Sequence, residues 1–202
     1  MNNQFLKEGR VKQKLQTRSE ILNSARKLLN EQSRITLENV AEHAGISRAT
    51  IYRYFSNIEL LTTEALLDVH FLSPQELEIE VKGLSLEGSI HAIQRHYNKT
   101  SQEHETVFRR YLSVTLMESI NSNKKLRGGR RIEALKLALK PFEKNLSSQD
   151  QKHLINISTL LMGIDALIVS KDVCGLNNEQ TNELLSWALD LILDGVTKKR
   201  KE

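Results

Sequence analysis

The amino-acid sequence predicts an all-α protein of about nine helices, in which a small amino-terminal domain precedes a larger helical one. Apolar residues recur at spacings of three and four through most of the chain, as they do along one face of an α-helix. The 202 residues include only two prolines, and no stretch alternates β-branched and polar residues for long enough to indicate a sheet. The 39% of hydrophobic residues suffice to fill a core of ordinary domain size.

Three parts are expected along the chain. Residues 1–16 form a basic arm without apolar periodicity, residues 17–72 form four helices around one small core, and residues 73–202 form the larger helical domain. Pro74 marks the second boundary, because proline disfavours helical angles in the residue before it. Residues 1–53 carry 10 Lys and Arg against 5 Asp and Glu, whereas the rest of the chain has a net charge of −1. A basic excess at one end favours binding to a polyanion.

Capping signals frame the first and fourth helices of the small domain. The first is expected over Thr17–Gln32, with Thr17 and Glu20 as a capping box before an apolar face. The fourth is expected to start near Ser56, where Ser56 and Glu59 form a second capping box.

Between them, residues 36–55 read TLENVAEHAGISRATIYRYF and predict two short helices joined by a glycine turn. The first helix has Thr36 at its N-cap and apolar residues at Leu37, Val40, Ala41 and Ala44. Gly45 permits a sharp turn, because a residue without a Cβ adopts left-handed angles at little cost. Ser47 then caps a second helix, whose Ile51 and Phe55 face the core. The pattern indicates a helix-turn-helix, and the alternative is an ordinary helical hairpin with solvated arginines.

The segment TLENVAEHAGISRATIYRYFSNIELL resembles the DNA-binding domain of the tetracycline-repressor (TetR/AcrR) family, and the resemblance extends over residues 17–67. It implies that the second helix of the motif enters the major groove of double-stranded DNA while the first crosses the backbone. Base contacts are then expected from Arg48, Ala49 and Tyr52, and phosphate contacts mostly from Thr36, Ser47, Thr50, Arg53 and Tyr54. Family members often carry a phosphate-binding lysine where this chain has Ile58, so that contact is expected to be missing.

The basic arm has two interpretations that the sequence leaves open. Its Lys7, Arg10, Lys12 and Lys14 fit an arm that follows the DNA backbone or enters a minor groove. The same composition fits a disordered solubilising tail.

The larger domain is expected to consist of a short helix or connection at residues 73–83 and five longer helices. The long helices are expected at Ser85–Gln102, Glu103–Asn121, Leu126–Leu146, Ser148–Val173 and Asn178–Lys198. The last two carry wide apolar stripes, which fit either an intramolecular core or a dimer interface. The family resemblance implies a four-helix bundle between two copies, and we expect a homodimer on a palindromic operator. Its interface is expected to include Leu160, Ile164, Leu167, Leu184, Ala188, Leu191 and Ile192.

A site for a small-molecule effector is expected among the middle helices. Aromatic, flexible and hydroxyl-bearing residues are mixed there, as in many ligand sites, although the same residues are typical of a core. The candidates are Tyr97, Thr100, Phe108, Tyr111, Thr115, Met117 and Asp165. Asp165 is an acid within an apolar stripe, which needs a partner or a cationic ligand unless it faces solvent.

No cofactor, metal site or catalytic residue is expected. His91, His96 and His104 are spaced by five and eight residues and do not share one helical face, and the single Cys174 offers no thiolate pair for zinc. The lone cysteine favours a reducing compartment, and no apolar run approaches the roughly 20 residues of a membrane span. We expect a cytoplasmic protein without a membrane partner.

These expectations together favour a repressor that leaves its operator when a small molecule binds the larger domain. Two alternatives belong to other classes of protein. One is a partner-binding or nucleoid-associated protein of the same fold without an inducer. The other is an α-helical enzyme, which no nucleophile–base pair or glycine-rich phosphate loop in the sequence supports.

Overall fold

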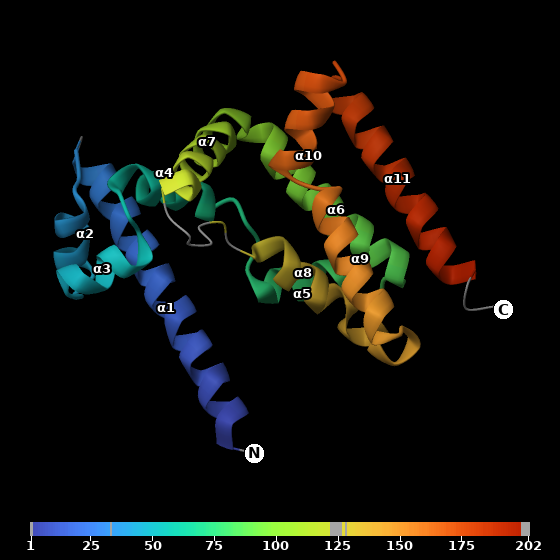
Figure 1. Cartoon of the computed structure of the whole chain (residues 1–202), viewed down its shortest axis with the longest axis horizontal. Coiled ribbons are helices and arrows are strands. Elements are labelled where there is room, and N and C mark those ends of the chain that lie inside the picture. The colour runs from blue at the N-terminus through green and yellow to red at the C-terminus, as the bar shows by residue number, and fades with distance from the viewer. Residues whose placement is uncertain (1, 33, 122–126, 128, 199–202) are drawn as a thin grey trace. The chain divides into compact units, whose positions relative to one another are not determined.

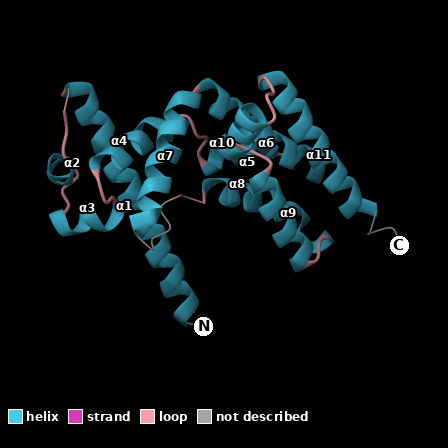
Figure 2. Ribbon diagram, turned by 45° about the horizontal axis from the view of Figure 1, so that its top comes forward, coloured by secondary structure: helices cyan, strands magenta, loops and turns pink. Residues whose placement is uncertain are grey.

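A computed structural model describes residues 2–32, 34–121, 127 and 129–198 (Figure 1). In these residues there are eleven α-helices, one 3₁₀ turn, one π-helical turn and no strand, which confirms the all-α class (Figure 2). This is two helices more than the nine expected from the sequence. Residues 74–81 form a true helix, α5 (Pro74–Val81), and the long helix expected over Ser148–Val173 is broken, which creates the short helix α10 (Ile164–Ile168).

The contacts divide the chain into two compact units. The first comprises the described residues of 1–69 and 110–124, and the second those of 70–109 and 125–202. Helix α7 (Glu105–Asn121) contributes its first five residues to the second unit and the others to the first. The chain therefore leaves the first unit after residue 69, returns to it through α7 and leaves it again.

The first unit consists of α1 (Asn2–Glu31), α2 (Leu37–His43), α3 (Arg48–Tyr54), α4 (Ile58–Asp68) and the later residues of α7. Helix α1 packs against α2 and α4, and α2 packs against α3. The fully buried side chains at the centre are Ile21, Leu22, Ile51, Phe55, Leu60 and Leu61. Helices α1, α2, α3 and α4 each contribute one apolar face to this core, as the periodicity predicts.

Both capping boxes expected from the sequence are wrong. Helix α1 begins at Asn2, so that Thr17 lies inside it, and Glu20 accepts a hydrogen bond from Gln16 Nε2 at 2.9 Å instead. The basic arm contains no proline that would end a helix, and the helix continues back through it. Helix α4 is capped by Asn57, whose Oδ1 accepts from the Leu60 amide at 2.8 Å. Asparagine caps a helix as well as serine does, and at residue 57 its acceptor lies three residues before Leu60.

The second unit is built around α6 (Leu86–Glu103). Helix α6 packs against α5, α8 (Arg130–Leu139), α10 and α11 (Asn178–Lys198), and α8 also packs against α9 (Ser148–Leu160) (Figure 1). The 3₁₀ turn η1 (Lys140–Asn145) follows α8, and the π-helical turn η2 (Val169–Val173) follows α10. Buried Ile90, Ile93, Leu135, Leu139, Leu154 and Leu189 form much of its core. The helix expected over Leu126–Leu146 thus corresponds to α8 and η1, and residues 126 and 128 lie outside the described part.

The break between α9 and α10 lies at Gly163, whose φ of 78° and ψ of −164° are accessible almost only to glycine. Polar side chains satisfy the backbone groups that the break exposes. Arg131 Nη1 donates to the carbonyls of Met162 at 2.6 Å and Thr159 at 3.2 Å, and Asn98 Oδ1 accepts from the Gly163 amide at 2.8 Å. Buried Gln94 donates to the carbonyls of Leu161 and Leu185 at 2.9 and 3.0 Å. These bonds connect α6 with the end of α9 and with α11.

Within the described ranges no single helix is long and apolar enough to cross a membrane, and one bent pair, α9 with the α10–η2 segment at 49°, meets the criterion of length and composition only when its two parts are taken together.

We expect Gly163→Ala to destabilise the second unit by about 1–3 kcal/mol, the cost of a strained backbone conformation. The added Cβ would lie 3.2 Å from Arg131 Nη1, so the arginine that caps α9 must also shift. Urea unfolding followed by the fluorescence of Trp187, the single tryptophan, measures the effect. Gly195→Ala is the matched control, since Gly195 lies within α11 with open space around its Cβ position. It should stabilise by about 0.5–1 kcal/mol. Equal stability of G163A and the wild type would show that the break does not need this glycine.

Candidate DNA-binding interface

The turn between α2 and α3 follows from the hydrogen bonds at the end of α2. Gly45 has a φ of 64°, and its amide donates to Glu42 O at 3.0 Å. The next amide, that of Ile46, donates to Ala41 O at 3.0 Å. This pair of bonds is the Schellman motif, which ends a helix with a left-handed glycine. The expected glycine turn is therefore present, and it directs the chain into α3.

Side-chain caps begin both helices of the motif, at the positions expected from the sequence. Thr36 Oγ1 accepts from the Asn39 amide at 3.2 Å, and Asn39 Oδ1 accepts from the Thr36 amide at 3.2 Å. Ser47 Oγ accepts from the Thr50 amide at 3.1 Å. Such caps satisfy amides that have no partner in the first turn of a helix.

Helix α3 buries one face and exposes the others. Ile51 and the C-cap residue Phe55 are at most 1% exposed. The residues on the other faces include the predicted base-reading residues Arg48, Ala49 and Tyr52, all exposed, together with exposed Arg53 and half-buried Thr50 and Tyr54. The guanidinium of Arg53 lies 5.7 Å from the centre of the Tyr54 ring. The helix thus presents its amino-terminal turn and one polar side to solvent, which is the surface that reads a major groove in such motifs.

An ion pair between α1 and α4 lies against Phe55, the residue that ends α3. Arg18 donates through Nε and Nη2 to the two oxygens of Glu64 at 2.9 and 2.5 Å, and the Glu64 side chain is 7% exposed. The same guanidinium lies 4.6 Å from the centre of the Phe55 ring. This one arginine of α1 therefore contacts both α4 and the residue that ends α3. Neither Arg18 nor Glu64 was predicted, because they lie 46 residues apart and only the packing of α1 on α4 joins them.

An acidic residue of α2 contacts the predicted base-reading residues. Glu38 Oε1 accepts a hydrogen bond from Tyr52 Oη at 2.8 Å and lies 3.0 Å from Arg48 Nη2. The Arg48 guanidinium is also 5.7 Å from the centre of the Tyr52 ring. The hydrogen bond from Tyr52, with a smaller contribution from the charge of Arg48, holds the pKa of the Glu38 carboxyl below its usual value. No local sequence pattern identifies Glu38, which meets Tyr52 only because α2 and α3 cross.

The candidate effector residues fall into both units. In the second unit, the ring centre of Phe71 lies 5.5 Å from that of Tyr97 and 5.8 Å from that of Phe108. The guanidinium carbon of Arg130 lies 4.9 Å from the centre of the Phe71 ring. Burial raises the pKa of Tyr97 to about 12. Phe71 was not predicted to belong to the site, and it joins two aromatic residues that were. Thr100, also buried there, donates its hydroxyl hydrogen to the carbonyl of His96 at 2.8 Å.

The other candidate effector residues have different surroundings. Tyr111, Thr115 and Met117 belong to the first unit, where Thr115 donates to the Leu112 carbonyl and Met117 is exposed. Asp165 is in the second unit and accepts from Arg127 Nη2 at 2.6 Å and Arg131 Nη2 at 2.8 Å. Burial acts to raise the pKa of Asp165, but the hydrogen bonds and charges of the two arginines outweigh it and lower the pKa. The partner that this acid needs is thus supplied by the chain itself.

The residues expected at a dimer interface divide by exposure. Ile164 and Leu167 are buried within the second unit, and Ala188 and Ile192 are half-buried. The exposed ones are Leu160 at 67%, Leu191 at 54% and Leu184 at 39%, and the exposed Trp187 lies between the last two on α11. Of the residues expected at the interface, those available to a partner therefore lie on α9 and α11.

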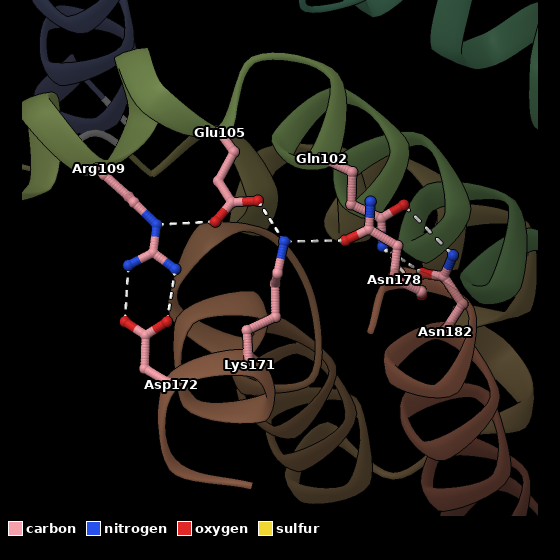
Figure 3. Close-up of polar contacts among 7 residues, drawn as sticks. All are labelled: Gln102, Glu105, Arg109, Lys171, Asp172, Asn178 and Asn182. Atoms are coloured by element: carbon pink, nitrogen blue, oxygen red, sulfur yellow. Dashed lines mark hydrogen bonds and ion pairs between the residues drawn. The ribbon is translucent and has the colours of Figure 1, made fainter. Parts of the chain in front are cut away.

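A polar network connects the start of α7 with η2 and α11 (Figure 3). Arg109 donates to Glu105 at 2.8 Å and, through both Nη atoms, to Asp172 at 2.6 and 2.7 Å. Lys171 donates to Glu105 at 2.6 Å and to Asn178 at 3.2 Å. The hydrogen bond from Lys171 is the main reason that the pKa of Glu105 lies below its usual value.

The histidines considered as metal ligands have other contacts. His91 Nε2 lies 2.7 Å from Asp190 Oδ1, His96 Nε2 accepts from the Leu72 amide at 3.5 Å, and the His104 ring stacks on His70 with centres 3.5 Å apart. In the part of the chain that the structure describes, no three His, Cys, Asp or Glu side chains gather where they could hold a metal ion.

Comparison with known proteins identifies the amino-terminal segment. Residues 21–65 match the family described as bacterial regulatory proteins, tetR family. The match runs from the first core residue of α1 through the helix-turn-helix into α4. No curated protein matches the chain.

We expect Glu64→Gln to destabilise the first unit by about 3 kcal/mol, because it leaves the charge of Arg18 partly buried without its carboxylate. Amide hydrogen exchange of α1 and α4 measures the loss. Glu59→Gln is the control, since Glu59 pairs with Arg110 at the surface and its loss should cost only a few tenths of a kcal/mol. Unchanged exchange in E64Q would contradict the supporting role given to the Arg18–Glu64 pair.

Proposed function

Since the chain belongs to the tetR family of bacterial regulatory proteins, we propose that it is a repressor, which binds a palindromic operator as a homodimer and leaves it when a small molecule binds. The observation that supports this most directly is the surface of α3. The core-facing residues of this helix are buried, and most of its polar residues are exposed. The cap at its start and the packing of its apolar face hold it in place. The match to this family supports a DNA-binding transcriptional regulator.

In the proposed complex, α3 lies in the major groove and α2 crosses the phosphate backbone. Arg48 and Tyr52 then meet base edges together with Ala49, whose methyl group suits the methyl group of thymine. Phosphates are contacted mostly by Thr36, Ser47, Thr50, Arg53 and Tyr54. Arginine suits base reading because its guanidinium donates two hydrogen bonds to the O6 and N7 atoms of guanine.

The homodimer in this proposal uses the exposed apolar residues of α9 and α11. Leu160, Leu184, Trp187 and Leu191 are uncovered in the single chain, and burying them against a second copy removes apolar surface from water. A two-fold pair also places two recognition helices about 34–36 Å apart, one turn of DNA. Two half-sites supply the selectivity that one short helix lacks.

Release by a small molecule follows from thermodynamic linkage between ligand binding and operator binding. If the ligand binds better to a conformation in which the two recognition helices no longer match the half-sites, it lowers operator affinity by a coupling free energy of typically about 1–3 kcal/mol. The aromatic group of Phe71, Tyr97 and Phe108 is the proposed wall of its site, because small-molecule sites are mostly apolar with a few polar groups.

The test is to select bound duplexes from a random pool with the purified protein and then to screen compounds for release of the selected duplex. An enriched palindrome supports the dimeric regulator, and a releasing compound supports the effector. Absence of preference among duplexes, even at low salt, would overturn the proposal. Many unrelated sites together with a co-purifying protein would favour a nucleoid-associated role instead.

Arg48 and Arg53 should differ in their effect on the selected duplex. Arg48→Ala should relax base preference at one position of each half-site, at a cost of about 1–3 kcal/mol per contact, since Arg48 is placed to read a base. Arg53→Ala should weaken all sequences alike and reduce the salt slope by about one ion, as expected for a phosphate contact. Binding titrations of both variants on cognate and altered duplexes at several salt concentrations measure this. Equal effects from the two variants would contradict the assignment.

Leu191→Asp should separate the proposed dimer, because the charge would have to be buried at its interface. We expect the dimer dissociation constant, from sedimentation equilibrium, to rise at least about tenfold, which corresponds to 1.4 kcal/mol. Ile79→Asp is a matched control, since Ile79 is 75% exposed on α5, a helix that packs mainly against α6 and α8. A wild-type chain that is monomeric, or an L191D variant as dimeric as the wild type, would exclude this interface.

A further inference from the structure

Glu38 places a negative charge within the surface that is proposed to face DNA. Its side chain is 42% exposed, and it contacts the two polar residues proposed to read bases, Arg48 and Tyr52. A carboxylate there is repelled by phosphates and lowers affinity for every sequence. Affinity for DNA alone does not explain a carboxylate at this position. The contacts of Glu38 indicate its other role.

One oxygen of Glu38 contacts both residues. Oε1 accepts the hydrogen bond from Tyr52 Oη at 2.8 Å and lies 3.0 Å from Arg48 Nη2, while the guanidinium approaches the Tyr52 ring at 5.7 Å. Arg48, Tyr52 and Glu38 therefore form a closed triangle of contacts across α2 and α3. A glutamate is ionised at neutral pH at its ordinary pKa, and the Tyr52 hydrogen bond lowers the pKa of the Glu38 carboxyl further.

The triangle has a consequence for how Arg48 engages DNA. An exposed ion pair contributes little to stability, so Arg48 leaves Glu38 easily when a better partner is offered. A single phosphate contact offers little more than the carboxylate already does. The paired acceptors of guanine offer two aligned hydrogen bonds, which are worth about 1–3 kcal/mol of discrimination. The exchange thus favours the correct base over the backbone.

We propose that Glu38 is a specificity-determining residue, which orients Tyr52 and Arg48 and withholds Arg48 from the phosphates of non-cognate DNA. This rests on the proposed function, in which α3 reads DNA. Glu38 acts through Arg48 and Tyr52, so it is a positioning residue and needs no contact with a base of its own. Its effect is on the ratio of cognate to non-cognate affinity more than on either affinity alone.

The test compares Glu38→Gln with Glu42→Gln in salt titrations on the selected duplex and on a scrambled one. Both variants remove one carboxylate from α2, and it is Glu38 that contacts Arg48 and Tyr52. For E38Q we expect the loss of repulsion to raise affinity for both duplexes, and non-cognate affinity to rise about fivefold more than cognate affinity, so that the ratio falls about fivefold. Its non-cognate salt slope should steepen by about 0.9, as Arg48 becomes free to release one more counterion. E42Q should leave the ratio and that slope unchanged.

Two further measurements keep the roles separate. In an Arg48→Ala background, E38Q should no longer change the ratio, because the residue through which Glu38 acts is absent. Thermal unfolding of E38Q should match that of the wild type, since the carboxylate is exposed.

The outcomes distinguish this inference from the proposed function. A wild-type protein without preference for any duplex overturns the proposed function itself. A wild-type protein that prefers its selected duplex, combined with an unchanged ratio in E38Q, overturns only the role of Glu38. The same fall in ratio for E38Q and E42Q, or a fall that persists in the R48A background, also overturns it, since the effect would then be one of general charge.

Discussion

A helix of seven residues is unstable by itself in water, because nucleating its first turn costs more than its few hydrogen bonds return. Helix α3 has this length, and its fold depends on the burial of Ile51 and Phe55 in the core of the first unit. The ion pair of Arg18 with Glu64, against the ring of Phe55, fixes the far end of the helix, and the Ser47 cap fixes its start. The positions of the residues of α3 that are proposed to contact DNA follow from these contacts.

The same constraint limits what α3 can read. With one face committed to the core, only two turns of polar side chains remain, and Arg48 and Tyr52 are the largest of those placed for bases. A surface this short gains selectivity in two ways. It can be duplicated by two-fold symmetry, or its side chains can be held in place before DNA arrives. The exposed leucines of α9 and α11 serve the first in our proposal, and Glu38 serves the second.

Local signals made the helix-turn-helix predictable from the sequence, whereas long-range contacts did not show in it. Gly45 and Ser47 act within a few residues, through a left-handed angle and a cap, so their pattern predicts the turn directly. Gly163 has the same kind of signal, a left-handed φ, but it lies within a continuous apolar stripe. The stripe predicts a single helix across it. Glu38 and Phe71 carry no local signal at all, since their partners lie far along the chain and only tertiary packing brings them together.

Helix α7 belongs to both units, and its first five residues are held both by charges and by buried Phe108, which packs edge-on against Phe71. Glu105 and Arg109 bind Lys171 and Asp172 of the π-helical turn, a conformation often found at functional positions (Figure 3). Partly exposed ion pairs of this kind are worth on the order of 0.2–1 kcal/mol each. Together they are comparable with a coupling free energy of about 1–3 kcal/mol. In the regulator that we propose, ion pairs of that size are weak enough for an effector to replace, whereas the packing of Phe108 on Phe71 resists such a change.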